Sequence, residues 1–579
     1  MGKWKIGWGL SNACNMRCGF CYSRSVRKEP NFERRVEEGL NFVLRNKDKI
    51  ESINFGTGEP TIEPMLFKLI EAIRKDAPHI LIGITTNGTL AEAVKDPYNM
   101  DVLRKWIDDI DVSLDYGTAA EQDRSRGYDG AFALAIRSLE LCQKLGKNTT
   151  VVNALHKYNG TIENVDRLVQ IARIYNADFR INIYRPTAGF DFVIGYPELR
   201  KILTHLVKYY EIDSLADPLF ASLFGTPCEA GDPCAKSSFR IIPNGFITPS
   251  TYLLDNEWRA QRVDEVEDID DLRKMESFTR VLNAPIPQEC GNCHYREKCR
   301  GGVIDRRWLF YHDLSKRDPY CPHLNGDDTD WTSLSGSAIL SQERKSFVHD
   351  GYLPTLIFSP VLNERVYNRW DKIYRDSEEE YASSEPEKTV TELSGYLSKE
   401  AHILDLGSGL GRNGLYYLRR GGSVTFADHS KIACDRLLKT ILKEQPDGPY
   451  EILDADIRDV LSDMDAESQD AVLAIHVISH GTPDEIEQHF VKEIYRVLKP
   501  GGVSALTLPS VHDRRCQNMP ESSEGIRSAA FTEGSEAGIV HSFYNETAVE
   551  KLFRTFEIIR KEEIHTDANS HWHLIVRKR

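Results

Sequence analysis

Cys14-Asn-Met-Arg-Cys18-Gly-Phe-Cys21 is the stretch that decides how the first part of this sequence folds. Its three cysteines have C-x3-C-x2-C spacing and follow a short apolar run, residues 5–10, which we expect to be a strand. Four thiolates usually hold an iron–sulfur cluster, so three can bind three irons of a four-iron cluster. The fourth iron would stay open for a substrate or cofactor, as one position does at a catalytic zinc. A zinc knuckle and three unrelated thiols are the alternatives.

Strands and helices are expected to alternate over the residues that follow. A helix over 32–45 precedes a strand over 52–55, which ends in the turn Gly56-Thr-Gly-Glu-Pro60. Glycines in such a turn let the backbone approach a ligand closely. The next strands are expected at 80–85, 110–115, 149–155 and 179–184. This alternation predicts a parallel α/β fold whose site lies at the C-terminal ends of the strands.

The cysteine motif and the glycine turn together resemble the radical S-adenosylmethionine (SAM) enzyme family. The resemblance implies a partial (β/α)6 barrel over residues 1–215, a four-iron cluster on the three cysteines, and a reducing partner such as flavodoxin or ferredoxin. In that family SAM is cleaved to a 5′-deoxyadenosyl radical, and the protein mainly positions the reactants and excludes water. The resemblance assigns to SAM the residues Phe20 (adenine), Gly58 and Glu59 (methionine amine), and Ser113 and Arg126 (ribose and carboxylate). Loop packing is the other role open to Phe20, and a solvated loop charge is the alternative for Arg126.

Residues 216–330 hold a second group of cysteines, namely Cys228, Cys234, Cys290, Cys293, Cys299 and Cys321. Their spacing resembles the SPASM extension of radical SAM enzymes, which carries two auxiliary four-iron clusters. The last four cysteines match all ligands of one cluster. For the other cluster, Ser250 and Val303 stand where the family has cysteines. We therefore expect one auxiliary cluster, with a zinc site that uses His294 or His323 as the alternative.

The C-terminal part has a different glycine-rich motif. Residues 331–365 are polar and are expected to be an interdomain linker. Within 366–579, an apolar strand ends in Asp405-Leu-Gly407-Ser-Gly409, a turn at which doubly wound sheets bind nucleotides. Asp428 ends a second strand about twenty residues later, as expected for an acid that binds ribose hydroxyls. A Lys-Pro-Gly-Gly turn follows at 499–502.

These features are similar to those of class I SAM-dependent methyltransferases, and the resemblance implies a doubly wound, Rossmann-like domain. By position, Asp405, Gly407 and Gly409 would hold the methionine end of SAM, Asp428 the ribose, and Asp456 the adenine. His476 is the candidate catalytic base, and His480 and His541 are further candidates. Each histidine is equally suited to a packing or scaffold role.

Composition limits the remaining function classes. The chain has 579 residues, 12 cysteines and a net charge of −15. That charge argues against a nucleic-acid-binding surface, which needs a basic face. No apolar run approaches the length of a membrane span, and the N-terminus lacks the apolar segment of a signal peptide. We therefore expect a cytoplasmic protein without membrane partners, in which clustered cysteines bind metal rather than form disulfides.

The sequence as a whole predicts a bifunctional enzyme. One half would abstract hydrogen from an unactivated carbon of a peptide or a small natural-product precursor. The other half would transfer a methyl group to an O, N or S nucleophile of the same pathway. Two alternatives stay open. In one, the C-terminal domain binds SAM only as a regulatory or substrate-binding module; in the other, the whole chain is a metal-sensing or scaffold protein with degenerate sites.

Overall fold

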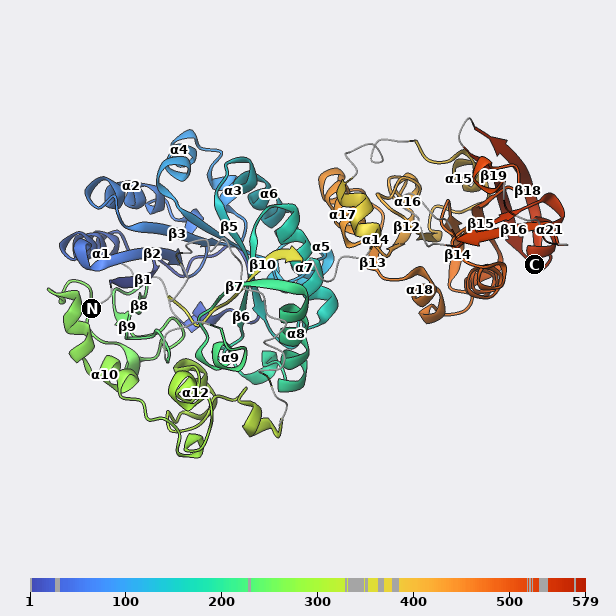
Figure 1. Cartoon of the computed structure of the whole chain (residues 1–579). Coiled ribbons are helices and arrows are strands. Elements are labelled where there is room, and N and C mark those ends of the chain that lie inside the picture. Colours follow the sequence, from blue (N-terminus) through green and yellow to red (C-terminus); the bar gives the residue numbers. More distant parts are fainter. Residues whose placement is uncertain are drawn as a thin grey trace. The chain divides into compact units, whose positions relative to one another are not determined.

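The computed structural model forms two compact units, Met1–Val366 and Tyr367–Arg579 (Figure 1). The residues that it describes are 3–25, 32–226, 231–327, 331, 348, 352–362, 369–376, 385–517, 519, 522, 524–530, 540–566 and 569–579. Within these ranges no helix is long and apolar enough to cross a membrane.

The first unit is built on six parallel strands that pair in the order of the sequence. They are β1 (Trp4–Gly9), β2 (Ile50–Gly56), β3 (Leu81–Thr86), β4 (Asp109–Ser113), β5 (Asn148–Leu155) and β6 (Asp178–Ile183). The connecting helices are α1 (Phe32–Arg45), α2 (Leu66–Asp76), α3 (Leu90–Ala93), α4 (Pro97–Trp106), α5 (Ala119–Arg126), α6 (Ala131–Lys144) and α7 (Ile162–Ile174). The predicted parallel α/β fold of this part is confirmed, and each predicted strand overlaps an observed one.

Four further strands extend this sheet at its two ends. At one end β8 (Ser238–Ile241) pairs parallel with β1, and β9 (Ile247–Thr248) pairs antiparallel with β8. At the other end β10 (Leu356–Leu362) lies antiparallel between β6 and β7 (Tyr210–Leu215). Helix α8 (Tyr196–Tyr209) leads into β7.

Strand β10 falls inside the segment 331–365, which the sequence led us to expect as a linker. That expectation is wrong for residues 356–362, because they belong to the sheet of the first unit. Leu356, Ile357 and Phe358 are at most 1% exposed. Their apolar run outweighs the polar composition of the surrounding segment, and it covers the edge that β6 would otherwise leave unpaired.

The cysteine-rich region contains the short helices α9 (Pro218–Leu223), α10 (Glu276–Leu282), α11 (Arg296–Cys299) and α12 (Ile304–Tyr311). A buried charge cluster stabilises it. Arg306 is fully buried and bridges Asp217, at 2.6 Å, and Asp318, at 2.7 Å. Both carboxylates satisfy the buried guanidinium, which would otherwise be costly to remove from water.

The second unit contains a seven-stranded sheet in the order β13-β12-β11-β14-β15-β19-β18. The strands are β11 (His402–Leu406), β12 (Ser423–Asp428), β13 (Tyr450–Asp454), β14 (Gln469–Ala474), β15 (Leu498–Pro509), β18 (Phe556–His565) and β19 (Ser570–Lys578). The first five strands of that order are parallel, and β19 runs antiparallel to both of its neighbours. The expected doubly wound, Rossmann-like sheet is confirmed.

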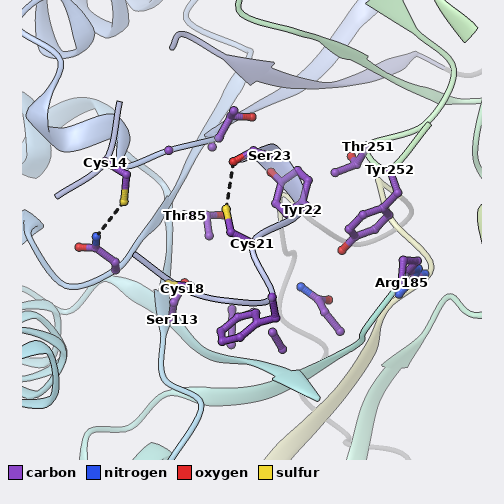
Figure 2. A pocket seen from close by; sticks show the side chains of 18 of the residues that line it. Cys14, Cys18, Cys21, Tyr22, Ser23, Thr85, Ser113, Arg185, Thr251 and Tyr252 are labelled. Carbon is purple, nitrogen blue, oxygen red and sulfur yellow. Dashed lines mark hydrogen bonds between the residues drawn. The ribbon is translucent and has the colours of Figure 1, made fainter. Parts of the chain in front are cut away.

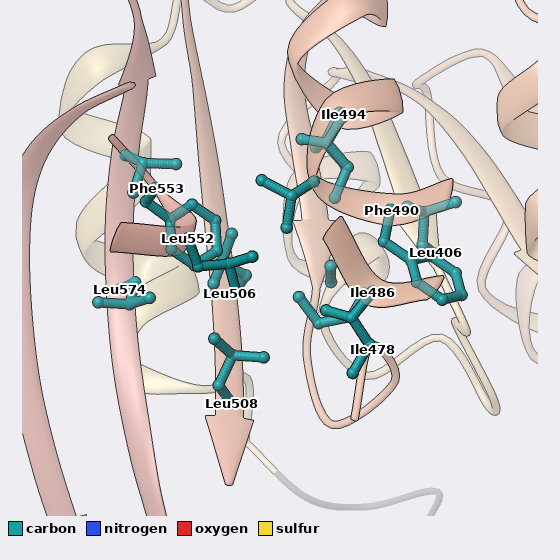
Figure 3. Packing of buried hydrophobic residues seen from close by; sticks show 14 of the residues in the cluster. Leu406, Ile478, Ile486, Phe490, Ile494, Leu506, Leu508, Leu552, Phe553 and Leu574 are labelled. Carbon is teal, nitrogen blue, oxygen red and sulfur yellow. The ribbon is translucent and has the colours of Figure 1, made fainter. Parts of the chain in front are cut away.

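Both faces of this sheet are covered, because successive residues of a strand point to opposite sides. Ile403 packs with α15 (Lys388–Leu393), α16 (Gly414–Leu418) and α17 (Lys431–Glu444). Leu404 and Leu406 pack on the other face with α18 (Ile457–Asp463), α20 (Lys492–Val497) and α21 (Glu546–Leu552). Figure 3 shows part of this second core, including Leu406, Phe490 and Leu506. Other elements of this unit are α14 (Arg369–Asp376), α19 (Pro483–Glu485) and the hairpin of β16 (Ile526–Ala530) and β17 (Val540–Tyr544).

Candidate active sites

The three N-terminal cysteines line one cavity of about 300 Å³ (Figure 2). Its wall is formed where β1 to β4 end, since Cys14 follows β1, Gly58 follows β2, Thr86 ends β3 and Ser113 ends β4. This is the edge at which parallel α/β folds place their sites. Of the residues predicted for SAM, Phe20, Gly58, Ser113 and Arg126 line this cavity.

A close backbone contact holds the cysteine loop against the glycine turn. Gly58 has a positive φ of 61°, and a Cβ atom there would lie 2.2 Å from the carbonyl oxygen of Ala13. The backbone N–H of Glu59 donates to the same oxygen at 2.8 Å. Only glycine fits this approach, so the two motifs that lie far apart in sequence form one wall.

Two thiols of this loop, those of Cys14 and Cys18, have raised pKa values. Cys14 is exposed at the cavity surface, and partial desolvation by the surrounding wall raises its pKa to about 11. Burial also raises the pKa of Cys18, although the guanidinium of Arg126 opposes the shift. Metal ligation needs thiolates, so binding iron here would release protons. The donor set suits a four-iron cluster, which binds each thiolate at a different iron.

Arg126 links the cysteine loop to the end of β4. Its Nη2 atom lies 2.5 Å from Oδ2 of Asp115, and its Nη1 donates to Sγ of Cys18 at 3.8 Å. The guanidinium lies over the ring of Phe20, which also contacts the ring of His156, with ring centroids 4.9 Å apart. Burial lowers the pKa of His156 to about 4, so this ring is neutral at pH 7. The sequence did not single out His156.

Glu59 does not line the cavity, in contrast to the role that the resemblance implied. Its carboxylate is 1% exposed. One oxygen accepts hydrogen bonds from the hydroxyls of Thr61, at 2.6 Å, and Thr86, at 2.8 Å, and the other accepts from the N–H of Asn87 at 2.6 Å. In this arrangement Glu59 ties the glycine turn to the end of β3, because local donors satisfy both of its oxygens.

A second, small cavity is lined by Cys290, Cys293, Cys299 and Cys321, together with Arg317 and His323. The four predicted ligands of the auxiliary site therefore lie together, and His294 does not join them. Cys228 lies outside the described residues. Among the described residues no three His, Cys, Asp or Glu side chains are arranged to hold a single metal ion.

The two positions at which the first auxiliary cluster would lack cysteines are both buried, and Ser250 belongs to a polar network. Asp305 is fully buried, and it accepts hydrogen bonds from Arg185 Nε and Ser250 Oγ, each at 3.0 Å. Val303 is also fully buried. Nearby, Asp232 accepts from the N–H of Cys234 at 2.9 Å. The oxygen of Ser250 is thus committed to a carboxylate.

The second unit has its own cavity, of about 450 Å³, at the C-terminal ends of β11, β12 and β14. Gly407, Asp428, Asp456 and His476 line it, as does His480. Asp405 and Gly409 do not line it. They support it, since the N–H of Gly414 donates to Asp405 Oδ2 at 2.9 Å and the N–H of Gly409 donates to Asp428 Oδ2 at 2.8 Å.

Aromatic residues that the sequence did not predict complete this cavity. Trp370 stacks on His480 with ring centroids 5.3 Å apart, and Tyr374 and Phe490 also line the space. His476 has a positive φ of 58°, and its Nε2 lies 3.7 Å from Oε1 of Glu387. His541 is 1% exposed and does not line the cavity. It lies behind His480, with the two ring centroids 4.8 Å apart.

Comparison with protein families gives one match in each unit. The profile of the Radical SAM superfamily matches residues 8–172, and a Methyltransferase domain profile matches residues 403–502. A curated relative is the mycofactocin maturase MftC of Mycobacterium ulcerans, 26% identical over 55% of this chain and 87% of the relative. Another is the AdoMet-dependent heme synthase of Methanosarcina barkeri, 23% identical over 55% of this chain and 97% of the relative.

Solved structures are similar to parts of this chain. Native anSMEcpe with bound AdoMet and Kp18Cys peptide is 18% identical and covers 57% of this chain and 97% of its own, with a TM-score of 0.46. A SAM-dependent methyltransferase of Methanosarcina mazei is 22% identical and covers 32% of this chain and 96% of its own, with a TM-score of 0.27.

Proposed function

We propose that this chain, in which a radical SAM domain is joined to a methyltransferase domain, is a bifunctional enzyme that uses SAM in two chemically different ways. Its first unit would abstract a hydrogen atom from an unactivated carbon of the substrate. Its second unit would transfer a methyl group to an O, N or S nucleophile. The observation that carries the proposal is that each unit has one cavity lined by most of its predicted SAM residues, all but Glu59 in the first unit and all but Asp405 and Gly409 in the second.

In the first unit, Cys14, Cys18 and Cys21 would hold a four-iron cluster, which when bound supplies the electron that cleaves SAM. The chain's own residues have other tasks. Gly58 and Ser113 would position SAM beside the cysteines, and Arg126, held by Asp115, would supply a fixed positive charge next to Cys18. The burial of this wall would keep water from the reacting carbon.

We propose one auxiliary cluster, on Cys290, Cys293, Cys299 and Cys321. The shared cavity of these four thiols supports it. The network around Asp305 argues against a second one, because Ser250 donates its hydroxyl to that carboxylate and valine at 303 has no ligand atom. The auxiliary cluster would accept or deliver an electron, and a donor such as flavodoxin or ferredoxin would reduce the first cluster.

In the second unit, Asp428 would bind the ribose of SAM, Gly407 the methionine end and Asp456 the adenine. His476 would act as the base that removes a proton from the methyl acceptor. Its position at the cavity wall next to Glu387 supports this role, because a carboxylate stabilises the imidazolium that forms. The substrate would be a peptide or a small natural-product precursor, and the names of the relatives, a maturase and a heme synthase, favour neither class.

The test separates the two chemistries. The anaerobically reconstituted chain is incubated with SAM, dithionite and a small-molecule extract of its host, and 5′-deoxyadenosine and S-adenosylhomocysteine are quantified by mass spectrometry. Cys18→Ala should abolish deoxyadenosine formation and leave S-adenosylhomocysteine unchanged, because two thiolates cannot hold the cluster. Retention of deoxyadenosine in Cys18→Ala would disprove the cluster assignment. Tight SAM binding by the second unit without any S-adenosylhomocysteine would make that unit a regulatory module.

A further inference from the structure

Three buried arginines line the cavity of the first unit in addition to Arg126. Arg180, Arg185 and Arg240 are each at most 3% exposed, and all three contribute to the cavity wall. Figure 2 shows Arg185, Thr251 and Tyr252 across the cavity from Cys14. None of the three is among the residues predicted to bind SAM. Arg240 lies between the glycine turn, where it contacts Thr57, and Tyr352.

Two of these charges are neutralised by the protein. Arg180 forms a two-point ion pair with Asp111, at 2.7 and 3.2 Å. Arg185 donates to Asp305 at 3.0 Å, and its guanidinium lies over the ring of Tyr252 at 4.7 Å. Its Nη2 atom is buried and has no hydrogen-bond partner within the described part of the chain.

Arg240 differs from both, because none of its contacts within the described ranges is a carboxylate. Its Nη1 donates to the hydroxyl of Tyr352 at 3.2 Å, its Nη2 donates to Thr57, and its guanidinium lies over the ring of Tyr22 at 5.6 Å. The Nε atom has no partner among the described residues. The ionisable groups that act most strongly on it are tyrosines.

A buried guanidinium without a counter-charge is expensive in a folded protein. Such groups are usually paired with an anion, and arginine matches carboxylate and phosphate groups with its planar fork of donors. We propose that the end of the cavity formed by Arg240, Arg185 and Tyr352 binds an anionic group, carboxylate or phosphate, of the molecule on which the first unit acts. This inference rests on the proposed function, since it names the substrate class of the same site.

The surroundings of Arg240 shape this subsite. Thr251 and Tyr352 form a hydrogen bond of 2.8 Å between their hydroxyls, and both line the cavity. The rings of Tyr22 and Tyr252 line the cavity beside these hydroxyls and the guanidinium. Such a wall accepts the anionic end of a molecule whose reacting carbon extends toward the cysteines.

The anionic group at Arg240 could come from the substrate or from the carboxylate of SAM itself, and the experiment distinguishes these two sources. Reconstituted holoenzyme saturated with SAM is titrated calorimetrically with malonate and with inorganic phosphate at constant ionic strength. The KM for SAM is measured in parallel from deoxyadenosine formation without substrate. Arg240→Gln is compared with Arg240→Lys, with Tyr352→Phe and with the control Arg34→Gln, whose side chain is 71% exposed on α1.

We expect the wild type and Arg34→Gln to bind malonate or phosphate in the presence of SAM. Arg240→Gln should weaken that binding about tenfold or more, as the loss of a charged hydrogen bond predicts, and should leave the KM for SAM unchanged. Arg240→Lys should retain part of the affinity for the anion, and Tyr352→Phe should bind the anion several-fold more weakly. If Arg240→Gln does not fold, these two variants provide the test. Absence of anion binding by the SAM-loaded wild type would overturn the inference. So would a raised KM for SAM in Arg240→Gln with unchanged anion affinity, which would assign Arg240 to the carboxylate of SAM.

The wild-type deoxyadenosine assay keeps this inference separate from the proposed function. If the wild type forms deoxyadenosine but binds neither anion, the subsite is wrong and the radical chemistry stands. If it forms none, the proposed function of the first unit fails, whatever the anions do.

Discussion

Replacement of Asp428 by alanine is the sharpest test of the second cavity. Asp428 is 7% exposed and lines the cavity where β12 ends. Its two oxygens accept hydrogen bonds from the backbone N–H groups of Gly409, at 2.8 Å, and Ser430, at 2.9 Å. Each carboxylate oxygen can accept a second hydrogen bond, so the ribose hydroxyls would add to a carboxylate that is already fixed in place.

The expected loss follows from these contacts. A hydrogen bond to a charged group contributes on the order of 1.5–3 kcal/mol. One tenfold change in affinity corresponds to about 1.4 kcal/mol, so Asp428→Ala should weaken SAM binding roughly 10- to 140-fold. We expect the upper part of this range, because the variant also removes the acceptor that holds Gly409 in its positive-φ turn.

Calorimetric titration of SAM measures this loss if the first site is disabled. The triple variant Cys14→Ala, Cys18→Ala, Cys21→Ala provides that background, since its remaining SAM site is in the second unit. Asp463→Ala, an exposed position on α18, is the control for the loss of one negative charge. A change of less than twofold in Kd for a folded Asp428→Ala protein would refute the assignment. Loss of deoxyadenosine formation in the otherwise wild-type background would do so as well.

The other predictions concern the first unit. The reconstituted wild type should contain eight irons, and Cys293→Ala should lose four of them; twelve irons in the wild type would mean that ligands other than the four matched cysteines complete another auxiliary site. Asp305→Asn should destabilise the first unit by about 3–5 kcal/mol, because it leaves Arg185 buried without its carboxylate. Adding Arg185→Gln should recover much of that loss in denaturant unfolding, whereas additive effects would show that the two side chains do not interact. Burial lowers the pKa of His156 to about 4 in the folded chain. Between that value and the ordinary pKa of histidine, the imidazole is protonated in the unfolded chain and neutral in the folded chain. Stability should therefore fall by about 2 kcal/mol between pH 7 and pH 5, and His156→Gln should remove that part of the pH dependence.

Local sequence was enough to predict the elements that carry the motifs. The predicted helix 32–45 is α1. The strands predicted before the cysteines, before the two glycine turns and up to Asp428 have bounds within a residue or two of those of β1, β2, β11 and β12. These elements were predictable because apolar periodicity and turn glycines are local signals. The short spacing of Cys14, Cys18 and Cys21 likewise places all three on one loop, because so few residues separate them.

Contacts between distant segments were decided by the tertiary structure alone. Glu59 was expected to face SAM, yet the ends of two neighbouring strands bring Thr86 and Asn87 to its oxygens and satisfy it inside the wall. The segment around 356–362 was expected to be a linker, yet its backbone pairs with the edges of β6 and β7 and its apolar side chains are buried there. Sequence composition records neither the donors nor the edges that a segment will meet.

The anionic subsite illustrates the same limit most clearly. Arg240, Thr57 and Tyr352 stand far apart in the sequence, and the sequence predicted no ligand for Arg240 or Tyr352. The parallel pairing of β8 with β1 brings Arg240 beside the glycine turn, and the chain leading into β10 brings Tyr352 to its guanidinium. The sequence determined the chemistry of the cysteine loop and of the two glycine turns through local spacing. The shape and charge of the space beside them were set by strand pairing between distant segments, because only packing decides which buried charges find a partner.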